Sequence, residues 1–455
     1  MGRDRDRDRD WSRYRMGAGG GAAAAGPVMH VVAAPVANAD EATYSTIKEF
    51  TLAPNTVYQF DVMLRQAMAV STIGPNLKWD GLAAIGATAQ SFWWQDVDLQ
   101  NDFGRFAADE NPANVGLAGG QSGRIFGRCR IETGETGGVV ALQQARASGV
   151  GSTSTTGADS TIIVRSGTAG DPLSADVPDS TSANNTPSGL TAVVPAGKTH
   201  LVEFLAPMDT TTGSSGFRLE LTGVAGDCKT YLVGRSTIVT GNPIGYAQRD
   251  GVEVVGSSGS TGDECMYLAV LVVAGAAERT IGLSFGPETN GQTATVRAGA
   301  VRFQRDVTDH VSILGGDGVT DDDAVADVVF TMALEAATPY QLLIGGFATA
   351  SGTTVGVQPS LTGLAALNAV CTGILFNHQT SIDSFTGVGS ANDADMSQAA
   401  TSSRGATEQM QWCEVHIVGA DAGNVLWNIT KENVAGTATQ EAGTWRILEP
   451  LELAA

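Results

Sequence analysis

Acidic side chains are densest in the stretch GGDGVTDDDAVADVVF, which begins at Gly315. Its carboxylates, at Asp317, Asp321, Asp322 and Asp323, are the hard oxygen ligands that calcium prefers. Their spacing differs from that of an EF-hand loop, which places its ligands at fixed positions. The sequence therefore favours a solvated acidic loop over a calcium site, and we expect no metal here.

The segment GDGVTDD within this stretch resembles the entry segment of pectate-lyase-like β-helix proteins. That resemblance implies a depolymerase, with a pair of carboxylates in a groove that binds a polysaccharide. The residues that follow do not form short solenoid coils but begin another copy of the repeat described below. We interpret the match as a coincidence within a linker.

Other residue types used in catalysis are scattered along the chain. The sequence contains no G-x-S-x-G elbow, no H-E-x-x-H motif, no P-loop and no dinucleotide-binding fingerprint. We therefore expect no catalytic residue, no cofactor and no enzymatic activity. The histidines lie far apart, at His30, His200, His310, His378 and His416.

The stretch SFWWQD places Trp93 and Trp94 side by side. Neighbouring residues of a strand point to opposite faces, so one ring is expected in a core and the other towards a surface. An exposed ring could stack on a sugar or seal a protein contact. Packing within a domain or at an interface is the interpretation we favour.

The N-terminus begins MGRDRDRDRDWSRYR, with arginine and aspartate in strict alternation. In a helix this order stacks like charges four residues apart, whereas in an extended chain it puts arginines on one edge and aspartates on the other. We expect an extended arm that orders along a partner offering charges of both signs, the alternative being a solvated tail. The candidate partner-binding residues are Arg3, Asp4, Arg5, Asp6, Arg7, Asp8, Arg9, Asp10, Trp11, Arg13, Tyr14 and Arg15.

Composition limits the classes of partner. The net charge is −21; residues 1–15 contribute six arginines and four aspartates, so the remainder carries −23. An acidic body argues against nucleic-acid binding, and no apolar run is long enough to cross a membrane. Residues 16–39 have some features of a secretory signal, but glycines, Pro27 and His30 interrupt the apolar run. A secreted surface protein is therefore a minor alternative.

The chain has an odd number of cysteines, none in a C-x-x-C pair or near a histidine at zinc spacing. We expect reduced, mostly buried thiols in a chain that folds in a reducing cytosol. The cysteines are Cys129, Cys228, Cys265, Cys371 and Cys413.

Internal similarity is the most informative feature of the sequence. The segments LAPNTVYQFDVML, VPAGKTHLVEFLA and LEAATPYQLLIGG align Tyr58, His200 and Tyr340, at spacings of 142 and 140 residues. We call such a set of equivalent residues, one from each copy, a repeat column. Strand and turn patterns predict a second and a third column, and the closing segments of the copies predict a fourth. They are Gly81, Gly223 and Gly363; Cys129, Cys265 and Cys413; and Arg165, Arg302 and Arg446.

Each copy consists of short alternating segments separated by Gly, Asn, Asp and Ser turns, which is typical of antiparallel β-sandwiches. We therefore predict an all-β protein of three tandem, jelly-roll-like β-sandwich domains with a period of about 140 residues. The expected boundaries are an extended N-terminal arm at 1–40, sandwiches at 41–170, 190–306 and 327–455, and linkers at 171–189 and 307–326.

Residues 43–450 resemble sandwich modules in virion proteins of tailed bacteriophages. The resemblance rests on the opening segments LAPNTVYQFDVML and LEAATPYQLLIGG and on the closing segments TATVRAGAVRFQR and TATQEAGTWRIL. It implies a structural role at the surface of the particle and supplies no catalytic residues.

We therefore expect a non-enzymatic virion protein, made in the host cytoplasm and located on the capsid surface. It would act as a decoration or cement protein that bridges coat subunits and is anchored by its arm. The expected partners are the major capsid protein or other virion proteins and further copies of this chain, with a trimer favoured. The alternative is a tail or fibre protein that binds host glycans.

Overall fold

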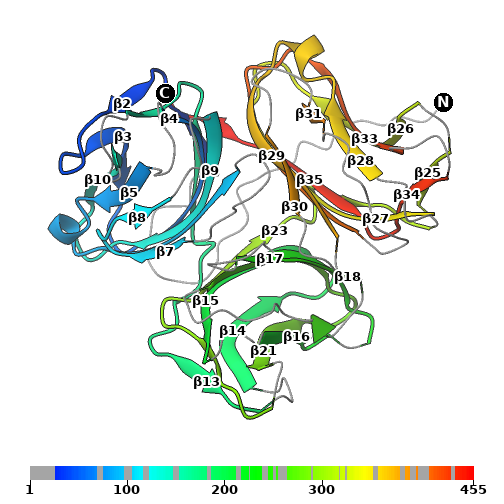
Figure 1. The fold of residues 1–455 in the computed structure, drawn as a ribbon, viewed down its shortest axis with the longest axis horizontal. Helices are drawn as coiled ribbons and strands as arrows, with labels where there is room; N and C mark the ends of the chain where they lie inside the picture. Colours follow the sequence, from blue (N-terminus) through cyan, green and yellow to red (C-terminus); the bar gives the residue numbers. More distant parts are fainter. Residues whose placement is uncertain are drawn as a thin grey trace, which may run out of the picture.

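A computed structural model gives the fold (Figure 1), in which the described residues form strands and two short 3-10 helices. The strands form six sheets in the described part of the chain, and these fall into three pairs along the sequence, here called units 1, 2 and 3. The structure describes residues 26–68, 75–96, 105–115, 122–146, 153–181, 186–211, 217–224, 226–237, 244–249, 253–254, 264–287, 290–316, 318–322, 325–351, 357–379, 385–389, 396–397, 409–431 and 436–454.

Unit 1 encloses a core between a large and a small sheet. The large sheet has the order β36-β1-β12-β4-β9-β6-β7, with β2 and β11 paired beside it, and the small sheet has the order β3-β10-β5-β8. Its elements are β1 (Val28–Val31), β2 (Val36–Asn38), β3 (Ser45–Leu52), β4 (Val57–Met68), β5 (Pro75–Asp80), η2 (Ala83–Ile85), β6 (Thr88–Asp96), β7 (Arg105–Ala108), β8 (Ala113–Asn114), β9 (Ser122–Glu132), β10 (Gly138–Arg146), β11 (Ser154–Thr156) and β12 (Thr161–Ser166).

Unit 2 repeats this plan, with the sheets β13-β22-β15-β20-β17-β18 and β14-β21-β16-β19. Strand β23 pairs with β15, as β12 pairs with β4 in unit 1. Its strands are β13 (Val177–Asp179), β14 (Thr186–Val194), β15 (Thr199–Thr210), β16 (Phe217–Thr222), β17 (Lys229–Thr237), β18 (Ile244–Arg249), β19 (Glu253–Val254), β20 (Glu264–Val273), β21 (Arg279–Pro287), β22 (Ala294–Val296) and β23 (Val301–Asp306).

Unit 3 has the sheets β24-β35-β27-β32-β29-β30 and β26-β33-β28-β31, and β25 and β34 complete the larger one. Its elements, with the final strand of the chain, are β24 (Val311–Ile313), β25 (Val319–Asp321), β26 (Asp327–Leu334), β27 (Tyr340–Ala350), β28 (Val357–Thr362), η3 (Ala365–Leu367), β29 (Val370–Gln379), β30 (Phe385–Gly389), β31 (Met396–Ser397), β32 (Gln409–Val418), β33 (Gly423–Lys431), β34 (Ala438–Gln440), β35 (Trp445–Pro450) and β36 (Glu452–Leu453).

The expected all-β, antiparallel sandwich architecture is confirmed. The small sheets have one face on the core and one towards solvent, so strands such as β3 and β14 alternate between buried and exposed residues. Each pair of sheets encloses its own apolar core. A further cluster of buried residues joins the three units, because the large sheets bury their second face against one another.

The strand register supports two of the repeat columns. Tyr58, His200 and Tyr340 occupy the same position on β4, β15 and β27. Gly81, Gly223 and Gly363 all have a left-handed φ, of 86°, 81° and 97°. A glycine is needed there because the chain turns directly against the backbone of the neighbouring strand.

The cysteine column is wrong. Cys129 pairs with Phe60, whereas Val270 and Val415 hold the equivalent positions in units 2 and 3. Cys265 and Cys413 lie at two other register positions, so the three thiols do not share one position of the repeat. All five cysteines are nevertheless buried, as expected, and burial raises the pKa of Cys129 to about 12.

The arginine column is correct for Arg302 and Arg446 but wrong for Arg165. Arg165 pairs with Gln59, and the equivalent positions in units 2 and 3 are Arg305 and Glu449. The position predicted for the first unit is therefore displaced by three residues from that of Arg302 and Arg446. The left-handed turn that precedes each closing strand, at Asp159, Gly299 and Gly443, indicates the correct register.

Parts of the expected arm and linkers form strands. Strands β1 and β2, within residues 1–40, belong to the large sheet of unit 1. Residues 171–189 contain β13, and residues 307–326 contain β24 and β25. These short strands pair at the sides of the large sheets, because an unpaired sheet edge leaves backbone groups without partners.

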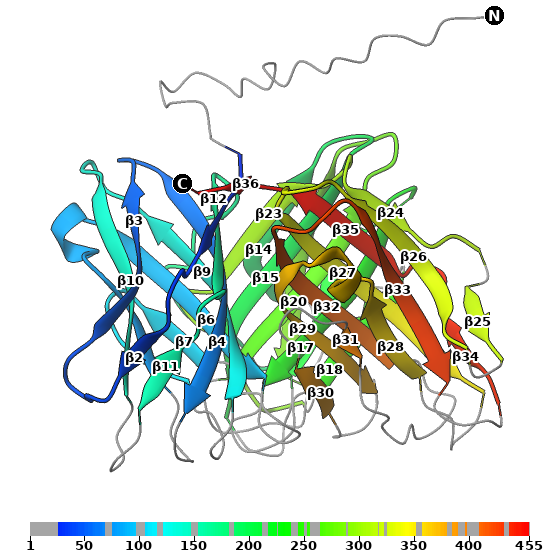
Figure 2. The same cartoon turned by 90° about the horizontal axis from the view of Figure 1, so that it is seen from above.

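The three units surround a common axis, and we call this arrangement the ring (Figure 1). Units 1 and 2, and units 2 and 3, follow each other directly in the chain. Units 3 and 1 meet through β36, which pairs in parallel with β1 and closes the ring. The beginning of β1 and the C-terminus therefore lie at the same end of the axis (Figure 2).

The turn at Gly81 provides a test of the fold. A Cβ there would lie 2.8 Å from the Val139 carbonyl oxygen, whereas a Cβ at Gly86, also left-handed, would meet nothing within 4 Å. We expect Gly86→Ala to cost about 1–2 kcal/mol from backbone strain alone, and Gly81→Ala to cost about 3 kcal/mol or more. Denaturant unfolding of the two variants measures this difference, and equal costs would contradict the close approach.

Candidate functional site

The feature that unites the molecule is the buried surface along the axis. On β4, residues Phe60, Val62 and Leu64 point into the core of unit 1, so the alternate residues point towards the other two units. The same alternation holds on β15 and β27. Side chains at equivalent positions of the three strands consequently line the axis. They form two layers along it, one of apolar side chains and one of polar side chains.

Aromatic rings build the apolar layer. Phe126, Tyr267 and Trp412 occupy one register position in the three units. Tyr267 lies between Trp94, with ring centroids 5.4 Å apart, and Trp412, at 5.7 Å. Edge-to-face contacts of this kind add to the free energy of apolar burial.

The tryptophan pair divides between two cores. Trp93 packs inside unit 1, and Trp94 packs in the cluster shared by the three units. Their opposite orientation and the expected packing at an interface are confirmed. Both rings are fully buried, however, so neither provides an exposed platform for a sugar.

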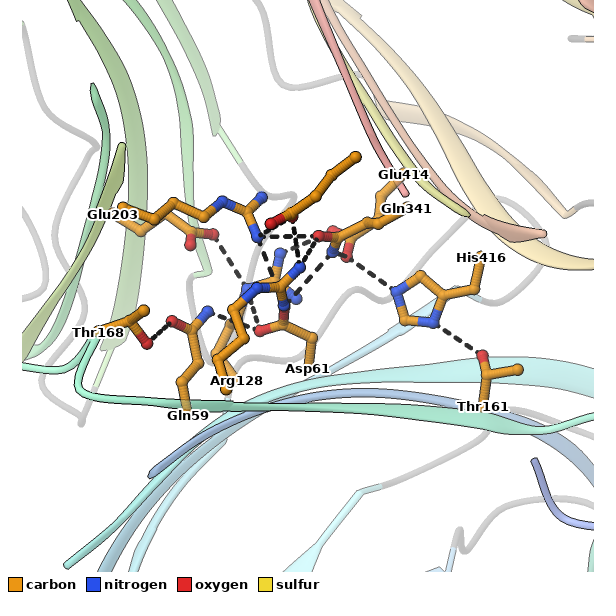
Figure 3. Close-up of polar contacts among 12 residues, drawn as sticks. Gln59, Asp61, Arg128, Thr161, Thr168, Glu203, Gln341, Glu414 and His416 are labelled. Atoms are coloured by element: carbon orange, nitrogen blue, oxygen red, sulfur yellow. Dashed lines mark hydrogen bonds and ion pairs between the residues drawn. The ribbon is translucent and has the colours of Figure 1, made fainter. Parts of the chain in front are cut away.

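Arg128 is the centre of the polar layer (Figure 3). Its guanidinium lies 3.4 Å from Asp61 of its own unit, 3.0 Å from Glu203 of unit 2 and 2.8 Å from Glu414 of unit 3. All four side chains are buried. A single cation therefore binds carboxylates from all three units.

Two further arginines extend this network. Arg165 of unit 1 forms an ion pair with Asp61 and another, 2.7 Å long, with Glu449 of unit 3. Arg305 of unit 2 lies 3.2 Å from the same Glu449. Gln341 of unit 3 accepts hydrogen bonds from both arginines and donates one, 2.8 Å long, to Glu414.

His416 links units 1 and 3 at the edge of the network. Its Nδ1 lies 2.7 Å from the hydroxyl of Thr161, and its Nε2 lies 3.3 Å from Glu414. The carboxylate of Glu414 can only accept, so Nε2 carries the proton in this arrangement. The network holds four carboxylates and three guanidinium groups.

The polar layer is not three-fold symmetric, although the three units share one plan of paired sheets. Equivalent positions hold Asp61, Glu203 and Leu343 on one column of strands, and Arg128, Ala269 and Glu414 on the next. Three identical subunits would place the same charge three times around the axis. One chain with three different units can instead place opposite charges in contact.

The surrounding guanidinium groups determine the ionisation of the buried acids. Burial alone would raise the pKa of Asp61, but Arg128, Arg165 and Arg305 outweigh it and lower that pKa. The same opposition lowers the pKa of Glu414, through Arg128, and that of Glu449, through Arg165 and Arg305. Asp61, Glu414 and Glu449 are therefore ionised at neutral pH, and the pairs act as salt bridges.

The predicted arm residues, Arg3 to Arg15, lie outside the described residues, as do Asp317 and Asp323 of the acidic stretch. Asp321 is not in a solvated loop. It is buried on β25 and accepts a hydrogen bond from the backbone N–H of Lys431. No group of three or more metal-ligating side chains occurs among the described residues.

The axial network was missed by sequence reasoning, although the strands carry a signal for it. Strands β15, β20 and β27 read as nearly continuous apolar runs, in contrast to the alternation of β3. Such runs are typical of sheets that are covered on both faces. An isolated charge within such a run, such as Glu203 on β15, therefore indicates a buried ion pair.

Comparison with models of known protein families found no match, and a search of curated protein sequences found none either. In the described part of the chain no helix is long and apolar enough to span a membrane. The class of the protein is consequently defined by its fold and its axis alone. It is a single-chain ring of antiparallel sandwich units held by a buried ionic centre.

Replacing Arg128 tests the importance of the centre. Arg128→Met leaves three buried carboxylates without their common partner, and we expect a loss of about 3–5 kcal/mol in the free energy of unfolding. Arg65→Met is the matched control, because Arg65 pairs with a partly exposed Asp159 and its loss should cost about 1 kcal/mol or less. Adding Asp61→Asn, Glu203→Gln and Glu414→Gln to Arg128→Met should recover part of the loss. Equal costs for the two single variants would contradict a central role for Arg128.

The lowered pKa values also predict a pH dependence. Asp61, Glu414 and Glu449 have ordinary values of 3.8, 4.5 and 4.5, which apply in the unfolded chain, and lower values in the ring. Their stabilising contribution is complete above these ordinary values and is lost as the pH falls through the lower, folded values. Thermal unfolding between about pH 7 and about pH 2 should show this loss, and the variant with all four substitutions should show less of it. An acid profile equal in the two proteins would contradict the assignment.

Proposed function

We propose that this chain is a non-enzymatic structural protein of a virus particle, most specifically a capsid decoration or cement protein of a tailed bacteriophage. In this role it binds the outer shell, bridges neighbouring coat subunits and is anchored by its N-terminal arm. The observation that carries the proposal is the single-chain ring. The start of β1, where the N-terminal arm joins the ring, lies at one end of the axis that the three units share (Figure 2).

The buried centre supports a mechanical role. Charged groups that contact ligands or substrates need access, but Arg128, Asp61 and Glu414 are fully buried, and Arg128 forms ion pairs with both acids. Their geometry serves to hold three sandwiches in a fixed order. A body of this kind can bridge several shell subunits because its contact surfaces do not move relative to one another.

The ring also bears on the expected partners. The three units within one chain already supply a three-fold arrangement, so association of three copies is not needed to produce it. The major capsid protein is the proposed partner, and the acidic body argues against nucleic acid. The alternative of a glycan-binding tail or fibre protein loses its two candidate residues, since Trp93 and Trp94 are buried.

Co-sedimentation with phage heads that lack this protein tests the proposal. We expect the full chain to pellet with the heads and a chain without residues 1–25 to remain in solution, because the arm contributes many weak contacts. A third variant with the arm order RRRRDDDD keeps the composition and removes the alternation. It should bind more weakly if charges of both signs are matched along the arm.

The outcomes separate the parts of the proposal. Equal pelleting of the full and shortened chains would mean that the ring alone docks, which contradicts anchoring by the arm. Failure of every variant to pellet would overturn the capsid role. Binding of the full chain to immobilised host glycans, in that case, would support the tail or fibre alternative.

A further inference from the structure

A small pocket opens in unit 1 where the described chain begins. Its volume is about 300 Å³, at the lower end of the range for ligand pockets. The walls come from the first strand, the closing strand and the edge of the small sheet. They consist of Gly26, Val28, His30, Phe50, Thr51, Leu52, Tyr58, Val164 and Ser166.

The equivalent place in the other units is occupied by a side chain. In unit 2, Gln304 reaches across the gap and donates a hydrogen bond from Nε2 to the Val193 carbonyl oxygen, and the same nitrogen lies 2.8 Å from His200 Nδ1. In unit 3, Leu448 packs against the core. Unit 1 has Val164 at this register position, and the shorter side chain leaves the space open.

The lining defines the chemistry of an occupant. Valine, leucine and aromatic side chains dominate it, and no carboxylate contributes. Burial and the nearby Lys48 lower the pKa of His30, so its imidazole is neutral at neutral pH. A guanidinium would lose its hydration here without a carboxylate in the lining to pair with its charge. The pocket therefore fits a neutral, largely apolar group.

The occupant should also donate a hydrogen bond. Thr51 in unit 1 is equivalent to Val193 in unit 2. Thr51 pairs with Val139, the second residue of β10, and Val193 pairs with Thr280, the second residue of the equivalent strand β21. The Val193 carbonyl accepts from Gln304 across the gap, so the Thr51 carbonyl has the equivalent position in the pocket wall. An indole ring combines a large apolar surface with one N–H donor.

We propose that this pocket binds the indole ring of Trp11 from the same chain. Trp11 lies 15 residues before Gly26, which itself lines the pocket, and the intervening sequence contains the small-residue run GAGGGAAAA. A glycine-rich chain of 15 residues has an average end-to-end distance of about 20 Å, which corresponds to an effective concentration of order millimolar. Binding within one chain is thus favoured over binding between copies at micromolar concentration.

Neighbouring charges distinguish Trp11 from the other aromatic residue of the arm. Tyr14 is flanked by Arg13 and Arg15, which would meet the positive charge of Lys48 beside His30. Trp11 is preceded by Asp10 and followed by Ser12. The segment around Trp11 is therefore the better electrostatic match, and Tyr14→Ala serves as a control that should change nothing.

Acrylamide quenching of tryptophan fluorescence tests this assignment on the full chain. The other six tryptophans are all buried, so an accessible tryptophan signal reports Trp11. The wild type should show little accessible signal, as Trp11→Phe does. Val164→Gln, which copies unit 2 and fills the pocket, should raise the accessible fraction to roughly one tryptophan in seven. If circular dichroism shows that the Val164→Gln variant does not fold, Val164→Leu is used in its place. This variant introduces the residue that unit 3 has at the equivalent position.

Two results would overturn the assignment. One is an accessible tryptophan fraction that is the same in the wild type and in the variant whose pocket is filled. The other is an accessible signal that rises on tenfold dilution of the wild type, which would mean binding between copies. The test uses the isolated protein, so it stands apart from the virion role and is not affected if particle binding fails.

Discussion

A charge buried between three bodies is the constraint on which this structure depends. Arg128 lies at the axis with carboxylates from units 1, 2 and 3 as its partners. Removing a guanidinium from water is costly, and the cost is offset only when every partner is in place. The large sheets can therefore bury their second faces only when the three units come together in one arrangement.

The unequal residues of the axis explain why a single chain suits this arrangement. Around an exact three-fold axis, a carboxylate on one unit would meet two identical carboxylates. Here Glu203 and Glu414 occupy different columns, and Arg128 lies between them. A fully apolar axis would be equally stable or more so, as replacements of buried ion pairs in other proteins indicate. The ionic centre instead joins one face of each unit, because Arg128 pairs with a carboxylate from every unit.

Closure of the ring rests on weaker elements at one end. Strand β36 pairs with β1 over two residues, and Leu451 packs with Met29 and Ile163. The contact between Thr161 and His416 reinforces the same interface deeper in the axis. The start of β1 and the end of the chain therefore share one end of the ring (Figure 2).

The sequence by itself determined the fold class and most of the repeat. Alternating apolar residues and turn-forming residues follow from local backbone geometry, so the all-β architecture and the columns of Tyr58 and Gly81 could be predicted. Columns defined by residue identity alone were less reliable, as Cys129 and Arg165 show, because a repeat conserves register and not side-chain type. Only the tertiary structure decided which faces of the large sheets meet and which charges pair. Those contacts join residues as distant as Arg128 and Glu414, and no local pattern encodes the distance between them.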